Sequence, residues 1–163
     1  MPSEKEMFIQ TWEREFQTTL KILKAYPSNK VDLQPHGKCP TAKELAWRIV
    51  SEEPVLVNGA ITGNFDFMNM PKPPATLPEV ITTYERSHRE QVEKVKKMDD
   101  AAFNKMLQFM VAPKTMAPMR SADILWMFMM DTIHHRGQFS IYLRMADAKV
   151  PSIYGPTADE PWM

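Results

Sequence analysis

Three segments of the chain begin with the same pattern, a Ser or Thr followed three residues later by Glu: Ser3 and Glu6, Thr41 and Glu44, Thr76 and Glu79. In this capping box the hydroxyl and the carboxylate each accept a hydrogen bond from a backbone amide that a starting helix leaves free. A fourth start is predicted at Ser121, which precedes the apolar run Ile124-Leu125-Trp126. The chain is therefore expected to form four long helices.

Apolar residues recur at helical spacing inside these segments. The first segment ends before Pro27 and carries Phe8, Trp12, Phe16, Leu20 and Leu23. The second carries Leu45, Ile49 and Leu56, but Pro54 interrupts it, which predicts a kink or a break near Glu52 and Glu53. The third, from Thr76 to about Met98, is more polar, with an inner stripe of Val80, Ile81, Tyr84, His88, Val92 and Val95.

Proline-bearing connectors separate the helices, and each is expected to be a loop: Pro27–Pro40, Asp66–Pro78 and Met110–Arg120. Asp99-Asp100-Ala-Ala-Phe predicts a short extra helix, and the tail Lys149–Met163 is too rich in Pro and Gly for a long one. We find no β alternation of useful length. The prediction is an all-α antiparallel four-helix bundle with an irregular C-terminal tail, formed as a single domain by residues 1–163.

Charge and composition exclude several classes of protein. Lys plus Arg equals Asp plus Glu at 20 each, and no basic stripe interleaved with aromatics stands out, so a nucleic-acid partner is not expected. The charged start and the lack of a long apolar run argue against a secretory signal and a membrane span, so we expect a soluble, cytoplasmic protein. The one cysteine, Cys39, is expected to be a free loop thiol.

The last helical segment places Asp131 and His135 one helical turn apart on one face. A single helix can therefore offer a carboxylate and an imidazole to one ligand. In the second segment Arg48 lies beside the core stripe, where an arginine needs a carboxylate partner. These polar residues are the candidates for a functional site.

Several of these stretches resemble the DinB-like proteins, the superfamily that includes YfiT. The likeness rests on Glu44-Leu-Ala-Trp-Arg-Ile49, on Asp131-Thr-Ile-His-His-Arg-Gly-Gln138 with Tyr142-Leu-Arg, and on Val150-Pro-Ser-Ile-Tyr-Gly-Pro156. It implies an up-down-down-up four-helix bundle, often a homodimer, that commonly holds a divalent metal with three histidines. One of these histidines comes from the second helix, and the other two form an H-x-x-x-H pair on the last.

The implied ligand pattern is altered in this chain. His135 matches the last histidine, but Asp131 stands at the position of the second and Arg48 at that of the helix-two histidine. Because a guanidinium repels a metal ion, we expect no cofactor and an Arg48–Asp131 ion pair, with His135 bonded to the same aspartate. The alternative is a surviving Zn, Ni, Mn or Fe site in which Asp131 and His135 recruit Glu52 and Arg48 turns aside.

Other residues receive simpler interpretations. His134 is expected to face solvent or a neighbouring helix, His36 to be exposed, and His88 to be solvated or partly packed. The run Trp126-Met-Phe-Met-Met130 is interpreted as core with a possible dimer interface. In Arg136-Gly137-Gln138, the glycine is expected to permit close approach of a neighbouring element, and the polar residues to hold the tail.

The resemblance leaves three functions open, and no catalytic residue is assigned. The first is a DinB-like protein with a degenerate metal site that binds a small molecule or is inactive. The second is a metal-dependent thiol transferase or isomerase in which Asp131 and His135 remain as ligands. The third is a non-catalytic dimeric stress or scaffold protein.

Overall fold

The three capping boxes form as the sequence predicts. A computed structural model describes residues 1–163, and in it the side chains of Ser3, Thr41 and Thr76 accept bonds from the amides of Glu6, Glu44 and Glu79. They open α1 (Glu4–Lys24), α2 (Ala42–Thr62) and α3 (Leu77–Lys96). A fourth long helix is α5 (Ser121–Met145), and the predicted short helix is α4 (Asp100–Phe103). One 3-10 turn, η1 (Ser28–Lys30), lies in the first connector.

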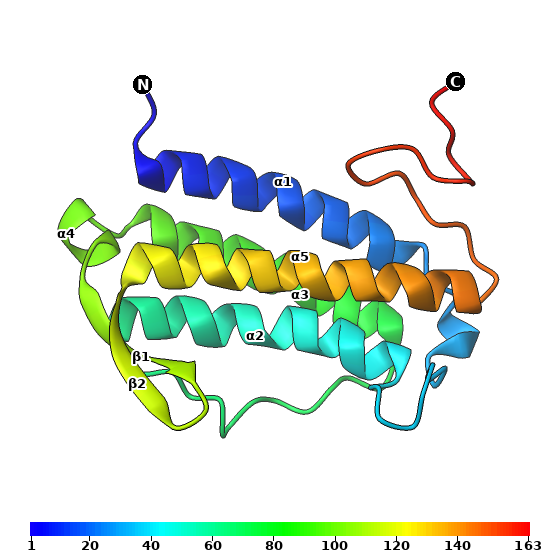
Figure 1. Cartoon of the computed structure of the whole chain (residues 1–163), viewed down its shortest axis with the longest axis horizontal. Helices are drawn as coiled ribbons and strands as arrows, with labels where there is room; N and C mark the ends of the chain where they lie inside the picture. Colours follow the sequence, from blue (N-terminus) through cyan, green and yellow to red (C-terminus); the bar gives the residue numbers. More distant parts are fainter.

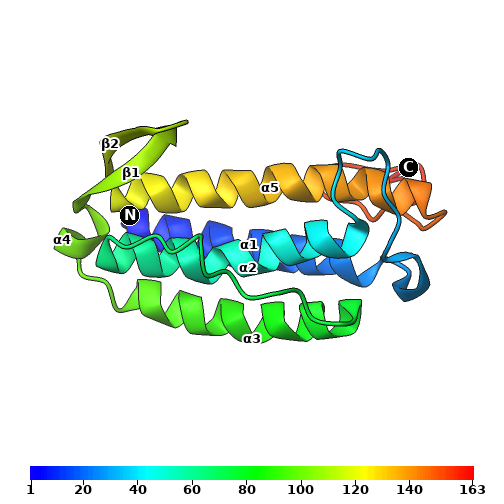
Figure 2. The same ribbon diagram turned by 90° about the horizontal axis from the view of Figure 1, so that it is seen from below.

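The four long helices pack side by side. Figure 1 shows α1 and α5 running in one direction and α2 and α3 in the opposite one. α2 contacts both α3 and α5, and α1 contacts the same two helices, so α1 and α2 lie diagonally opposite (Figure 2). The interface between α2 and α5 therefore brings together the two segments that carry the candidate site residues.

Helix α2 continues across Pro54. The break predicted near Glu52 and Glu53 does not occur, because the surrounding turns are held by burial of Ile49, Val50, Leu56 and Val57. Proline removes one amide donor from the helix, and packing against α3 and α5 compensates for that loss. Glu52 and Glu53 consequently keep helical positions and point in different directions around α2.

The all-α prediction is wrong in one place, because the third connector and the four residues before it form a β-hairpin. Strands β1 (Met106–Ala112) and β2 (Thr115–Arg120) pair antiparallel, with Ala112 opposite Thr115 and a bulge next to it. Lys114 makes the turn with a φ of 60°. The hairpin lies at the end of the helices where α2 ends and α5 begins (Figures 1 and 2).

The start of α5 also differs from the prediction. Arg120 occupies the N-cap position, and Ser121 is the first helical residue. The Ser121 hydroxyl donates to the carbonyl oxygen of Ala60 in α2 at 2.9 Å. Ser121 thus ties the start of α5 to the end of α2 instead of capping its own helix.

The interior consists of two apolar clusters separated by a polar layer. One cluster surrounds the C-terminal halves of α1 and α5, and the other surrounds their N-terminal halves and reaches α4 and the hairpin. Between them lie the buried polar side chains Glu15, Thr19, Ser51, Glu53, His88, Gln91, Thr132 and Arg136. Every fully buried side-chain nitrogen and oxygen has a hydrogen-bond partner.

The chain after Ala146 is irregular, as its composition predicts. It folds back over the helices, with Arg144 bound to Asp159 at 2.6 Å and Lys21 bound to Glu160 at 3.0 Å. None of the helices has the length and apolar character that crossing a membrane would require.

Candidate metal centre

Three side chains from α2 and α5 converge at the interface of these helices. They are Glu52 on α2 and Asp131 and His135 on α5, and one ligand atom from each lies within 4.8 Å of the other two. Nε2 of His135 is 3.3 Å from Oδ2 of Asp131, as expected for residues one turn apart. His135 and Glu52 are partly buried and Asp131 is exposed, so the group is open to solvent on one side.

The orientation of the His135 ring is set by Gln138. Nδ1 of His135 lies 3.0 Å from Oε1 of Gln138, an oxygen that only accepts, so Nδ1 carries the hydrogen of this bond. In the neutral imidazole Nε2 then has a free lone pair, and it faces the Asp131 carboxylate. A metal ion placed between these two acceptors would be bound by both.

Burial makes the Glu52 carboxylate costly to ionise. Desolvation raises the pKa of Glu52, and the nearby Asp131 carboxylate raises it further, while His135 and Arg48 lower it. A cation shared by Glu52 and Asp131 would remove the repulsion between these two groups.

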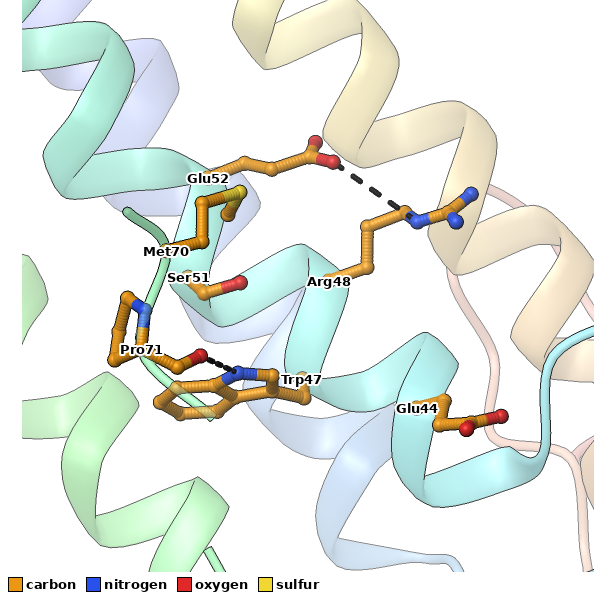
Figure 3. A pocket seen from close by; sticks show the side chains of 7 residues that line it. All are labelled: Glu44, Trp47, Arg48, Ser51, Glu52, Met70 and Pro71. Atoms are coloured by element: carbon orange, nitrogen blue, oxygen red, sulfur yellow. Dashed lines mark hydrogen bonds and ion pairs between the residues drawn. The ribbon is translucent and has the colours of Figure 1, made fainter. Parts of the chain in front are cut away.

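The expected Arg48–Asp131 ion pair is not formed. Nε of Arg48 lies 3.9 Å from Oε1 of Glu52, one turn along the same helix, and the arginine side chain is 50% exposed. Figure 3 shows Arg48 and Glu52 both extending from α2 toward α5. Of the first expectation, the contact of His135 with Asp131 is formed, but Arg48 lies closest to Glu52 instead of Asp131. Glu52 lies beside Asp131 and His135, as the alternative prediction requires, and whether the group holds a metal stays a prediction.

Arg48 and Glu52 line a polar hollow of about 330 Å³. Trp47 forms one wall, and its indole nitrogen donates to the carbonyl oxygen of Pro71 at 2.8 Å (Figure 3). This bond holds the loop between α2 and α3 against α2. The hollow thus has one edge on the metal-ligand candidates and another on a loop.

The prediction for His88 is wrong. Its side chain is only 1% exposed, and Nδ1 lies 3.2 Å from both carboxylate oxygens of Glu53 while Nε2 lies 3.3 Å from Glu13. Phe16 stacks on the ring with centroids 3.9 Å apart. Burial raises the pKa of Glu53, and the bond to His88 opposes that rise. His88 lies on the inner stripe of α3, and that position was the signal for its burial.

A second buried pair holds the C-terminal tail. Nη2 of Arg136 lies 2.7 Å from Oε2 of Glu15, and its Nη1 donates to Thr19 at 3.2 Å. The Tyr154 hydroxyl contacts both Arg136 and Glu15, so Arg136 holds the tail as the sequence predicts, whereas Gln138 bonds to His134 and His135 instead. Gly137, in contrast, has open space around it, and the expected close approach there is wrong. Sequence reasoning missed Glu15, which shares the α1 face of Phe8 and Trp12.

The remaining candidates lie outside the site. His134 is exposed and bonds to Gln138, and His36 is exposed, as predicted. Cys39 is a free, partly buried thiol. Phe128 and Met129 belong to the core, while Met127 and Met130 are exposed, and the dimer interface stays a prediction.

Comparison with known proteins places these observations in a family. The sequence model of the DinB family matches residues 1–162. The uncharacterised protein YrdA of Bacillus subtilis is 24% identical over 160 residues, which cover 94% of this chain and 89% of YrdA. A crystal structure of a DinB-like protein from Bacillus cereus superposes with a TM-score of 0.75 at 23% identity, covering 90% of this chain and 95% of that one. For the DinB-like protein YjoA of Bacillus subtilis the TM-score is 0.73 at 15% identity, with 90% and 97% covered. The chain belongs to the DinB family.

Proposed function

We propose that this chain binds a divalent metal ion with Glu52, Asp131 and His135, using the four long helices as the four-helix-bundle scaffold. The observation that carries the proposal is the convergence of two carboxylates and one imidazole within 4.8 Å, from two helices. This donor set suits Mn²⁺, Fe²⁺ or Zn²⁺. Ligand atoms around a tetrahedral ion lie about 3.4 Å apart, so small rotations of exposed side chains would complete the site.

The residues around the three ligands fit this role. Gln138 accepts from Nδ1 of His135 and thereby directs the Nε2 lone pair toward Asp131, which is the usual outer support of a metal-bound histidine. The two carboxylates balance the charge of a divalent ion. Arg48 makes no hydrogen bond within the protein. Its positive charge beside the site favours an anion as the further ligand of the metal ion.

A bound divalent ion would lower the pKa of a thiol or water that joins it. The chain contributes the three ligands, the cation Arg48, and the hollow beside Glu52 where a small molecule can enter. A metal-dependent reaction of a thiol or of water is thus the enzymatic form of the proposal.

The proposal is tested by loading the protein with Zn²⁺, Mn²⁺ or Fe²⁺, removing the free metal by dialysis, and measuring the bound metal. We expect one ion per chain in the unaltered protein, and a loss of at least tenfold in affinity for the variants His135→Ala and Asp131→Asn. His134→Ala is the matched control, because His134 is an adjacent exposed histidine that is not one of the three converging ligands. Substoichiometric metal in the unaltered protein, or equal losses in the His134 and His135 variants, would refute the site.

The second candidate function is a metal-free pocket for a small anion. It is favoured by Arg48, whose only ionic contact is 3.9 Å long and which lines the polar hollow with Trp47 and Ser51. Calorimetric titration of the chelator-treated protein with succinate tests it. Succinate should bind, and Arg48→Gln should abolish binding, whereas binding that survives this substitution would exclude an arginine-based pocket.

A further inference from the structure

A second hollow, of about 290 Å³, lies next to the metal-ligand candidates and has a different character. Its walls are apolar and consist of Leu56, Phe67, Phe109, Met127 and Phe128. The two other lining residues are Glu52 and Asp131. An apolar cavity of about 150 Å³ is enough to admit benzene, so this hollow has room for an aromatic ring with substituents.

The back of the hollow is held in place by packing. Phe128 belongs to the core, and Phe109 of β1 meets Phe65 edge to face with ring centroids 4.9 Å apart. Phe65 lies over Gly59, where a side chain would collide with its ring. Phe67 and Met127 are exposed and form the mouth. The inner surface is thus preformed and the entrance adaptable, which is typical of small-molecule sites.

The two hollows lie on opposite sides of Glu52 along α2. The polar one is reached from Arg48 and Ser51, which precede Glu52, and the apolar one from Leu56, which follows it. A molecule bound at the metal ligands could extend into either of the two hollows. The apolar part of such a molecule would bury more of its surface in the apolar hollow beside the hairpin than in the polar hollow beside Arg48. The hydrophobic effect therefore favours the apolar hollow.

We propose that the apolar hollow binds the aromatic or branched aliphatic body of a small ligand whose head group reaches the ion at Glu52, Asp131 and His135. The inference rests on the proposed function and specifies its substrate class. Met127, Phe67 and Phe109 decide specificity, because they form the surface that the body contacts. They come from a helix, a loop and a strand that are far apart in the sequence, and only the fold brings them together.

Two hydroxamates with the same metal-binding head test this inference. Benzohydroxamate carries a phenyl ring and acetohydroxamate only a methyl group, and each is titrated by calorimetry into the zinc-loaded protein. Burial of the ring should make benzohydroxamate bind about tenfold more tightly. Met127→Glu, which places a charge at the mouth of the hollow, should remove this advantage, measured as the ratio of the two hydroxamate affinities in the same zinc-loaded variant.

The matched control is Met130→Glu, an exposed methionine on the same helix that does not line the hollow. It should keep the tenfold advantage. Equal affinities for the two hydroxamates in a protein that retains stoichiometric zinc would overturn the inference and leave the metal site standing. The same advantage in the Met127 and Met130 variants would also overturn it. Absence of bound zinc would overturn the proposed function, and the inference with it.

Discussion

Replacing Arg136 by leucine should destabilise the protein strongly, because it strands a carboxylate in the middle of the fold. Arg136 is 1% exposed and Glu15 is 6% exposed, and their side chains lie 2.7 Å apart. Without the guanidinium, Glu15 keeps only the hydroxyl of Tyr154 as a side-chain donor. Removing one member of a buried ion pair costs about 3–5 kcal/mol of unfolding free energy.

The expected shift in melting temperature follows from the size of the chain. An unfolding entropy of about 2.1 cal/mol/K per residue, over 163 residues, gives about 0.34 kcal/mol/K. A loss of 3–5 kcal/mol therefore lowers the melting temperature by about 9–15 °C, which urea denaturation and scanning calorimetry can both measure. The double variant Glu15→Leu with Arg136→Leu should recover most of the loss, because it leaves no unpaired charge.

Arg144→Leu is the control on the same helix. Its ion pair with Asp159 has a half-exposed arginine, so Arg144→Leu should change the stability far less than Arg136→Leu does. Two results would show that the buried pair is not coupled as the structure indicates. One is a loss of unfolding free energy below about 1 kcal/mol for Arg136→Leu, and the other is a loss in the double variant that equals the sum of the two single losses.

Three further substitutions test other parts of the fold by urea denaturation. His88→Phe leaves the buried carboxyl of Glu53 without its imidazole partner and should cost about 2–3 kcal/mol of unfolding free energy without changing the metal content. A loss of bound metal would mean that the polar layer and the metal centre are one unit. Gly59→Ala places a Cβ in collision with the ring of Phe65 and should cost about 1–3 kcal/mol, whereas an unchanged stability would show that the ring moves freely. Thr41→Ala removes the cap of α2 and should cost about 1 kcal/mol, and no effect would mean that the capping box is formed but contributes nothing.

The helix starts could be predicted from the sequence because their bonds are local. In each capping box the hydroxyl and the carboxylate are three residues apart, so no distant part of the chain is needed to form it. The apolar stripe of α1 likewise predicts which face is buried, and Phe8, Trp12 and Leu23 lie in the core.

The hairpin could not be predicted in this way. Only Leu107 and Phe109 of β1 are buried at alternate positions, and Pro113 and Pro118 indicate a loop. Pro118 is nevertheless paired opposite Gln108, since both strands of a two-stranded sheet are edge strands, where proline is tolerated. Packing against α5 and the end of α2 decides that this segment forms strands.

In the candidate site, too, some features follow from local sequence and others from tertiary packing. The sequence by itself determined that Asp131 and His135 share a face of one helix, because this depends only on spacing within a segment. Only the tertiary structure decided that Glu52 joins the group, that Arg48 turns aside, and that His88 is buried against Glu53. The partner of a charge on α2 depends on how that helix is rotated against α3 and α5, and this rotation is set by the packing of the whole core.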